Sequence, residues 1–401
     1  MSEELKKERL YIIILAAIQV AHILDFVIMM PLGPMFMRTF HITPVAFSTL
    51  VSAYTFSAGI VGFLGALYAD HFDRKKFLLF NFTGFIIGTF LCARAWDFSS
   101  LLSGRIIAGA FGGILNASVL SLVADLIPFE RRGRAMGVVM SAFSISSILG
   151  VPTGLYIANQ LNWHWSFYFI CLVSLVFWLM SLLILPSVKQ ANKPRGFVDN
   201  LQNFKKIILQ KDYWHGFFLT SMLGFSIFMI IPFISPYMVR NVGVAEKDLP
   251  LIYLIGGLCT IVSARVIGQL CDKLGSFTMF KRVAIISLFP VLMLTNLPPV
   301  PLWCALACTT VFTMFGSGRF IPAMTMVSAV VKPEDRGTFM SLENSLRQLS
   351  SGLSSQLAGL IIGMSVSGRL THYSWLGFLS VFCTLTAILI AYHLKNKFQF
   401  R

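Results

Sequence analysis

Charged residues are scarce in this chain of 401 residues. Only 12% of the residues are Asp, Glu, Lys or Arg, whereas 56% are hydrophobic. A typical soluble domain carries about 25% charged residues. A soluble protein with this balance could not cover its surface with polar groups. The composition therefore excludes a large soluble enzyme or a nucleic-acid-binding domain.

Motifs for metal binding and for catalysis are also missing. The seven cysteines lie in or at the ends of apolar segments and form no CxxC pair, so neither a disulfide framework nor a zinc site is supported. No HExxH, no Walker motif and no serine elbow occurs. We therefore expect no enzymatic activity, no metal and no cofactor.

Long apolar runs dominate the sequence instead. A helix that crosses a bilayer needs about 20 apolar residues, so twelve crossings would use roughly 240 of the 401 residues. The runs predict an all-α membrane protein with twelve transmembrane helices. The predicted spans are 10–37, 45–69, 77–95, 98–126, 135–158, 164–187, 213–240, 250–271, 278–297, 301–331, 337–364 and 373–394.

The distribution of Lys and Arg predicts the orientation of these spans. With both termini in the cytoplasm, 23 basic residues fall in or beside inside loops and five fall outside. Basic residues accumulate on the cytoplasmic side of membrane proteins. This rule explains the net charge of +15 better than a nucleic-acid partner does. We expect a multi-pass protein of a bacterial plasma (inner) membrane.

The two halves of the chain resemble each other. Asp70 in ALYADHFDRKK and Asp272 in GQLCDKLGSF stand 202 residues apart, and the same offset relates PLGPMFMRTF to PFISPYMVRN. We predict a six-helix bundle over 1–187, a cytoplasmic linker over 188–212 and a second bundle over 213–401. Parallel repeats of this kind place a substrate site near the bilayer midplane, between the halves. The linker stretch NFKKIILQK predicts a short amphipathic helix.

Several motifs resemble those of major facilitator superfamily transporters. The loop after the second span keeps Asp70, Arg74 and Lys75 of the family pattern without its glycines, and RIIAG in the fourth span begins at Arg105. PLGP resembles the PxxP of drug:proton antiporters, and GVPTG matches their GPxxGG in part. The resemblance covers essentially the whole chain and is nearest to the twelve-span drug:proton antiporters and sugar-efflux-like permeases. It implies a secondary active transporter that works as a monomer by alternating access.

Asp25 is one of two acidic residues well inside the predicted spans. A charge in the hydrocarbon costs about 2.5–3.5 kcal/mol on insertion scales, so it needs a partner or a water-filled cavity. His22 lies three positions before Asp25 and therefore on the same helical face. Two interpretations stay open. Asp25 is a proton-coupling or substrate-binding acid with His22 as its relay, or it forms a structural ion pair with Arg105.

Glu343 is the second acidic residue, and Arg347 follows it at i+4 on the same predicted span. The two side chains can pair along one helix. Alternatively, Arg347 and Arg319 hold an anionic group of a substrate, with Glu343 as a second proton site. Further candidates for the substrate cavity are Asn116, Asn344 and Phe228.

The family resemblance also implies gate residues. By this resemblance, Asp70 latches the outward-open state, with Arg134 as its local partner. Asp272 is the counterpart of Asp70 in the second half, and Arg74 belongs to the same loop motif. These residues would open and close the path rather than bind the substrate.

Two functions are compatible with these features. The first is proton-coupled efflux of a small amphipathic compound. The second is import or export of an organic anion or metabolite, such as a siderophore, an amino-acid derivative or a sugar. In both cases the partners are a small-molecule substrate, the lipid bilayer and, in the first case, protons.

Overall fold

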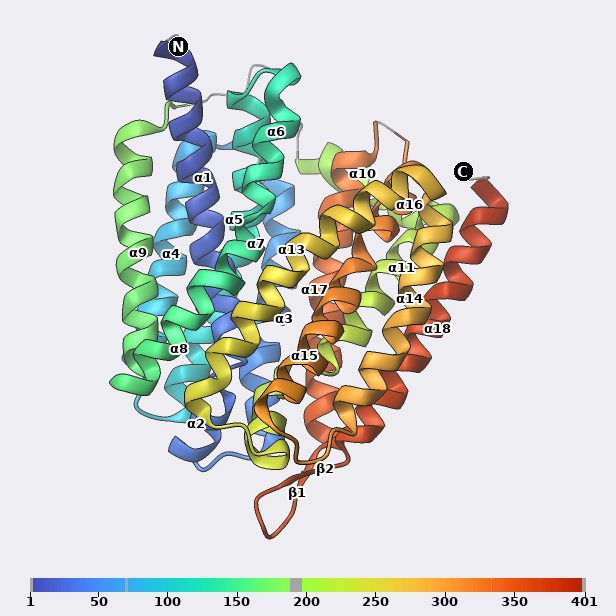
Figure 1. The fold of residues 1–401 in the computed structure, drawn as a ribbon. Helices are drawn as coiled ribbons and strands as arrows, with labels where there is room; N and C mark the ends of the chain where they lie inside the picture. The colour runs from blue at the N-terminus through green and yellow to red at the C-terminus, as the bar shows by residue number, and fades with distance from the viewer. Residues whose placement is uncertain (1–2, 69–70, 188–196, 333, 399–401) are drawn as a thin grey trace. The chain divides into compact units, whose positions relative to one another are not determined.

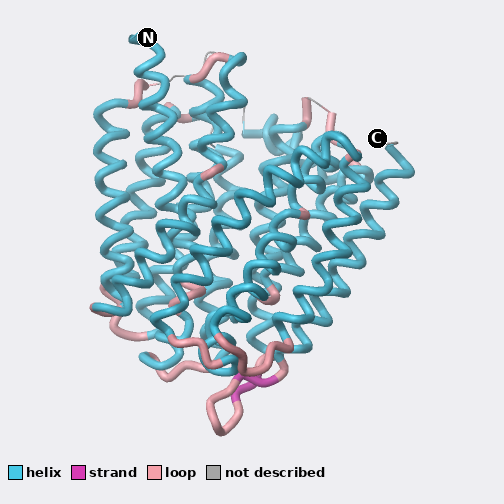
Figure 2. The backbone as a smooth tube through the Cα atoms, viewed as in Figure 1, coloured by secondary structure: helices cyan, strands magenta, loops and turns pink. Residues whose placement is uncertain are grey.

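The computed structural model describes all residues except 1–2, 69–70, 188–196, 333 and 399–401. Nearly all of the described chain is helical, as Figure 2 shows, and one short antiparallel hairpin interrupts the helices near the C-terminal end. In this hairpin Gly363 lies opposite Thr371.

The helices follow the apolar runs of the sequence (Figure 1). They are α1 (Glu3–Ile28), α2 (Gly33–Thr39), α3 (Pro44–Tyr68), α4 (Arg74–Ala93), α5 (Phe98–Leu126), α6 (Phe129–Met140), α7 (Ala142–Ile145), α8 (Val151–Gln160), α9 (Trp163–Ile184), α10 (Phe197–Leu209), α11 (Lys211–Phe228), α12 (Ile234–Tyr237), α13 (Leu249–Leu274), α14 (Ser276–Thr295), α15 (Leu302–Gly318), α16 (Phe320–Val330), α17 (Arg336–Ile361) and α18 (Tyr373–Phe398). Short π and 3-10 turns are η2 (Ser146–Gly150), η3 (Ile231–Phe233), η4 (Met238–Val242) and η5 (Glu246–Asp248), and the strands are β1 (Gly363–Met364) and β2 (Leu370–Thr371).

Eleven helical segments of the described chain are long and apolar enough to cross a membrane, judged by length and composition. The remaining expected span, 337–364, corresponds to α17. It has 26 residues, as many as α1 or α18, but it carries Glu343, Arg347 and a run of serines. The all-α membrane fold is confirmed. The helix predicted in the linker is present as α10.

Several of the expected spans are interrupted by prolines or by short turns. The span expected at 10–37 ends at Ile28, and α2 begins after a turn with Pro34 in its first turn. Proline lacks the N–H that continues a helix but is tolerated at a helix start. The span expected at 213–240 breaks after Phe228, where Pro232 lies in a 3-10 turn.

The spans expected at 135–158 and 301–331 are also interrupted. The first contains the π-helical turn η2 directly before Pro152. The second breaks at Arg319, which separates α15 from α16. A break in a membrane helix frees backbone groups and redirects the side chains around it. The orientation of polar residues at these breaks, such as Arg319, therefore differs from that in a continuous helix.

The chain divides into two compact units. The first consists of Met1–Met29 and Ala53–Leu201, and the second of Met30–Ser52 and Gln202–Arg401. A division at the linker would place Met30–Ser52 with the N-terminal half, but this segment belongs to the second unit. The predicted division into two bundles stays a prediction.

In the first unit, α5 packs closely on its neighbours because it presents backbone instead of side chains. A Cβ on Gly113 would lie 2.3 Å from the carbonyl oxygen of Ala58 on α3. On α4, a Cβ on Gly88 would lie 2.4 Å from the backbone nitrogen of Ala108 on α5. Small residues permit such close contact between membrane helices. A core of aliphatic and aromatic side chains surrounds these contacts.

Gly113→Leu should therefore lower the thermal stability of the detergent-purified protein. The new side chain meets the backbone of α3, and overpacking costs about 1–3 kcal/mol even where neighbours can adjust. Gly137→Leu on α6 is the control, because nothing lies within 4 Å of a Cβ at that position. The melting temperatures of both variants are compared with wild type. Equal melting temperatures for the two variants would contradict the packing described here.

Candidate functional site

Asp25 and Arg105 form a buried ion pair in the first unit. Asp25 lies on α1 and Arg105 on α5, and both side chains are 0% exposed. Arg105 donates hydrogen bonds from Nη1 to Oδ2 of Asp25 over 2.9 Å and to the Asp25 carbonyl over 3.2 Å. Thr89 on α4 donates to Oδ1 over 3.1 Å. The carboxylate thus joins three helices, and the pairing that the sequence left open is present.

The ion pair does not satisfy the whole Arg105 guanidinium. Its Cζ lies 4.4 Å from the centre of the Tyr54 ring, a distance at which the face of an aromatic ring attracts a cation. Its Nε and Nη2 are buried and have no hydrogen-bond partner among the described residues. These two guanidinium nitrogens can therefore donate hydrogen bonds to a further polar group.

A column of polar side chains continues from Asp25 along α1. Gln19, His22 and Asp25 are spaced three residues apart, on one face of the helix. Gln19 donates from Nε2 to Oδ1 of Asn116 on α5 over 2.8 Å. His22 lies between them, 7% exposed, and neither of its ring nitrogens has a partner in the described part of the chain. The interface of α1 and α5 thus gathers four of the predicted site residues, Asp25, His22, Arg105 and Asn116.

Gly112 makes room for this column beside His22. A Cβ on Gly112 would lie 2.5 Å from Oη of Tyr54 and 2.9 Å from Cδ2 of His22. Both rings therefore pack against bare backbone of α5, with their centres 6.3 Å apart. The buried Tyr54 hydroxyl also has no hydrogen-bond partner among the residues described. Buried polar atoms of His22, Tyr54 and Arg105 that have no hydrogen-bond partner among the described residues therefore lie at or near the Tyr54 ring.

In the second unit, Glu343 pairs with Arg347 along α17. Arg347 donates from Nε to Oε1 of Glu343 over 3.1 Å and from Nη2 to Oδ1 of Asn344 over 2.8 Å. The Glu343 side chain is 3% exposed, whereas that of Arg347 is 35% exposed. The self-pairing that the spacing allowed is present. The Arg347 guanidinium therefore remains partly exposed although it is paired.

Arg319 lies inside the second unit, at the break between α15 and α16. It is 1% exposed, and it donates to Oγ1 of Thr384 over 2.7 Å and to Oγ of Ser226 over 3.0 Å. Among the described residues, no carboxylate forms an ion pair with Arg319, and no hydrogen bond joins it to Arg347. Phe228 is half-buried at the end of α11. Helix α11 therefore carries Phe228 and the Ser226 partner of Arg319.

Comparison with known proteins identifies the family. The profile of the Major Facilitator Superfamily matches residues 15–355. The chain belongs to the Major Facilitator Superfamily. It is similar to the uncharacterized MFS-type transporter YceJ of Bacillus subtilis (strain 168), with 23% identity over 86% of this chain and 85% of the relative. It is also similar to Multidrug resistance protein 2 of the same organism, with 22% identity over 92% of each chain.

A solved structure agrees in fold. A POT family transporter in complex with a thioalcohol conjugated peptide superimposes with a TM-score of 0.77 at 11% identity, over 96% of both chains. At this identity the likeness shows the fold alone. The family predicted from the sequence motifs is confirmed, and this facilitator is a transporter of small molecules and not an enzyme.

Among the residues expected at the gate of this facilitator, Arg74 has a defined partner. Its Nε lies 3.3 Å from Oδ2 of Asp125, near the end of α5. Asp70 lies outside the described residues. Arg134 and Asp272 are exposed, and neither has a hydrogen bond or ion pair to another described residue. The gating roles of these residues stay predictions.

A second polar cluster of the facilitator ties the linker helix α10 to the start of α17. Asp335 is 7% exposed, and its two carboxylate oxygens accept hydrogen bonds of 2.9 Å from Nζ of Lys206 and from Oη of Tyr213. Burial acts to raise the pKa of Asp335, but the hydrogen bonds from Lys206 and Tyr213 outweigh it and lower the pKa. The carboxylate therefore stays charged and holds the linker helix to its bundle.

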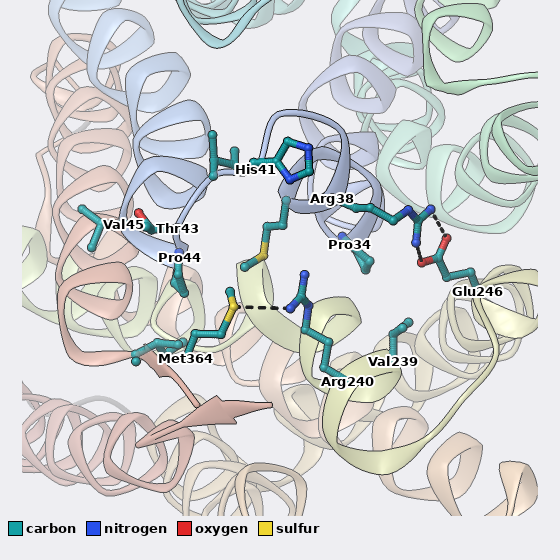
Figure 3. Close-up of a pocket in the computed structure, with 14 residues that line it drawn as sticks. Pro34, Arg38, His41, Thr43, Pro44, Val45, Val239, Arg240, Glu246 and Met364 are labelled. Carbon is teal, nitrogen blue, oxygen red and sulfur yellow. Dashed lines mark hydrogen bonds and ion pairs between the residues drawn. The ribbon is translucent and has the colours of Figure 1, made fainter. Parts of the chain in front are cut away.

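A pocket of about 850 Å³ lies in the second unit beside α2 and η4. Arg38 and Arg240, one repeat apart, both line it (Figure 3). Arg38 donates to both carboxylate oxygens of Glu246 over 2.6 and 3.1 Å, and these bonds raise the pKa of Arg38. Arg240 instead donates to the carbonyl of Gly368 over 3.0 Å. The two arginines occupy matching positions in the sequence repeat, but Arg38 binds a carboxylate and Arg240 binds a backbone carbonyl.

Sequence reasoning missed the partners of the predicted charges. Tyr54 and Thr89 are uncharged residues in apolar helices, and no sequence signal separates them from residues that only pack. Asp125 did carry a signal, because it is an acidic residue at the end of a predicted span. Such a residue needs a cation nearby, and Arg74 provides it.

The buried pair predicts an asymmetric pattern of stability. Asp25→Asn leaves Arg105 buried without a counter-charge, and removing one partner of a buried pair costs about 3–5 kcal/mol. Asp25→Asn combined with Arg105→Gln removes both charges and should recover much of this loss. Thermal unfolding of the purified variants measures both effects.

The exposed pair of Arg38 and Glu246 supplies the control. Its arginine side chain is 63% exposed, and surface pairs contribute about 0–1 kcal/mol. Glu246→Gln should therefore change the melting temperature little. A double variant at Asp25 and Arg105 that is no more stable than Asp25→Asn would show that the two charges are not coupled.

The Asp335 cluster predicts a dependence of stability on acid pH. The folded-state pKa of Asp335 lies below its unfolded value of about 3.9. Its contribution is complete above that value and disappears as the pH falls through the folded-state pKa. The stability difference between wild type and Asp335→Asn should be constant from about pH 5 to 7 and shrink below about pH 4. Unfolding measured across this range checks the sign, and a difference that grows on acidification would refute it.

Proposed function

We propose that this facilitator exports small amphipathic compounds in exchange for protons, and that Asp25 carries the coupling proton. The buried pair of Asp25 and Arg105 supports this proposal most directly. A carboxylate inside a membrane bundle is expensive, and such residues mark ion and proton pathways. The similarity to a protein named Multidrug resistance protein 2 supports the substrate class.

The chemistry of the pair suits proton coupling. When Asp25 takes up a proton, it no longer neutralises Arg105, whose cation stays buried. The protonated state therefore favours any rearrangement that gives Arg105 another partner or exposes it. Loss of the proton restores the ion pair. Binding of one proton thus biases two states of the first unit, which is the requirement for coupling.

Gln19, His22 and Asn116 supply a path for the proton in this proposal. Gln19 and His22 follow one face of α1 from Asp25 toward the N-terminal end of the helix, and Asn116 of α5 contacts Gln19. His22 is the member that can both accept and donate a proton, and neither of its ring nitrogens is engaged with a described residue. His22 is therefore assigned as the relay between Asp25 and that end of the bundle.

A second candidate function is transport of an organic anion or metabolite, such as a siderophore, an amino-acid derivative or a sugar. Arg347 favours it, because its side chain is 35% exposed although it pairs with Glu343. A guanidinium with free access suits a carboxylate of a substrate. In this case Arg347 and Asn344 bind the anion, and Glu343 is the site of any coupled proton.

The remaining features of the proposal follow from the charge distribution and the family. We place the protein in a bacterial plasma membrane as a monomer, with both termini in the cytoplasm. Asp70, Arg74, Arg134 and Asp272 act at the gate of an alternating-access cycle.

The test uses everted membrane vesicles with an imposed proton gradient and a pH-sensitive dye. The panel contains lipophilic cations, zwitterions and organic anions. Wild type is compared with Asp25→Asn, and with Glu343→Gln as the matched carboxylate variant of the other half. Asp25→Asn with Arg105→Gln keeps the comparison valid if the single variant folds poorly, and Asp25→Glu tests whether a displaced carboxyl suffices.

Proton-coupled efflux of amphipathic compounds predicts that lipophilic cations discharge the gradient through wild type and Glu343→Gln but not through either Asp25→Asn protein. Discharge by anions alone, abolished by Arg347→Gln, would establish the second function instead. Full activity of the Asp25→Asn variants would assign the Asp25 pair to structure.

A further inference from the structure

A pocket of about 310 Å³ lies between the first turns of α1 and the first turns of α6. Both helices belong to the first unit and begin at the same end of it (Figure 1). The floor of the pocket is apolar and includes the buried Ile127 and Ala135. Its rim carries three arginines and one glutamate, which are Arg9, Arg131, Arg134 and Glu8.

The charges of this rim are only partly neutralised. Arg131 donates from Nη2 to Oε1 of Glu8 over 2.7 Å and so joins the two helices. Arg9 and Arg134 are exposed, and neither has an ion pair or hydrogen bond with any residue that the structure describes. Three positive charges against one negative charge leave a net charge of +2 over an apolar floor.

Arg9 and Arg134 stand at equivalent positions in their candidate spans. Arg9 is four residues into the span Leu5–Ile28, and Arg134 is four residues into the span Glu130–Gln160. Each therefore lies about 6 Å from the beginning of its span. This is the level at which lipid headgroups meet the hydrocarbon.

An exposed aliphatic side chain follows each arginine one turn deeper. Ile13 stands at i+4 from Arg9 and is 55% exposed, and Val138 stands at i+4 from Arg134 and is 40% exposed. Residues at i and i+4 share a helical face. Both walls of the pocket thus present a cation above an apolar surface.

We propose that this pocket binds one anionic phospholipid, with the phosphate between Arg9 and Arg134 and an acyl chain against Ile13 and Val138. Guanidinium groups bind phosphate oxygens in charge-assisted pairs, and basic pockets between transmembrane helices are suited to anionic headgroups. The Glu8–Arg131 pair connects the two helices across the rim and neutralises one of its three arginines. The lipid therefore fastens the start of α1 to the start of α6.

Native mass spectrometry of the full chain in detergent tests this site. The probes are phosphatidylglycerol, phosphatidylcholine and soluble glycerol phosphate. Arg9→Gln with Arg134→Gln should weaken phosphatidylglycerol binding about thirty-fold, because each basic residue near a membrane surface contributes about a factor of five. Lys281→Gln with Arg282→Gln is the matched control, since it removes two exposed cations of the second unit that do not line the pocket.

Two further variants separate this site from diffuse charge attraction. Glu8→Gln removes the negative charge and releases Arg131, so it should tighten phosphatidylglycerol binding. Ile13→Ser with Val138→Ser should weaken phosphatidylglycerol binding without changing the binding of glycerol phosphate. Melting temperatures without added lipid verify that each variant is folded.

The proposal is overturned if the control pair loses as much affinity as the arginine pair, or if phosphatidylcholine binds as well as phosphatidylglycerol. Glycerol phosphate that binds as tightly as the lipid would show a simple phosphate site and would also reject it. Selective loss in the arginine variant, with a gain in Glu8→Gln, establishes the lipid site.

Discussion

A full charge inside an apolar bundle must have a partner, and the arrangement of the first unit depends on how Arg105 meets this requirement. Its carboxylate partner lies on α1, and the hydroxyl that supports this carboxylate lies on α4. The Tyr54 ring covers the guanidinium from α3. Four helices therefore meet at one ion pair. Because the pair is completely buried, its hydrogen bonds connect the packing of these helices.

The second unit meets the same requirement in another way. Arg319 is as deeply buried as Arg105, but its described partners are the hydroxyls of Ser226 and Thr384. The acidic residue of this unit, Glu343, lies on another helix and pairs with Arg347. The two units thus differ in their polar interior. This difference is the physical reason why the two proposed functions depend on different units, proton-coupled efflux on the first and anion transport on the second.

Close helix packing and helix breaks supply the framework for both arrangements. Gly112 and Gly113 let α5 approach its neighbours, and Gly112 in particular leaves space for the rings of His22 and Tyr54. Breaks near Pro34 and Pro232 shorten α1 and α11 and turn the chain toward the pocket that contains Arg38 and Arg240. Near the beginning of α1, Arg9 lines the small pocket that this helix shares with α6. One helix therefore carries the buried Asp25, the polar column beside it and one wall of the small pocket.

Composition and motif spacing were enough to predict the all-helical membrane fold, the family and the identity of the rare intramembrane charges. These properties are local, because an apolar run of span length or a charge within it is visible without knowing its neighbours. The choice between Arg105 and another partner for Asp25, and the self-pairing of Glu343 with Arg347, depended on tertiary structure, since each pairing needs the relative rotation of the helices. The break at Arg319 and the roles of Tyr54 and Thr89 depended on it too. Uncharged residues in apolar helices have no distinguishing pattern, and only their contacts separate a residue that supports a charge from one that fills space.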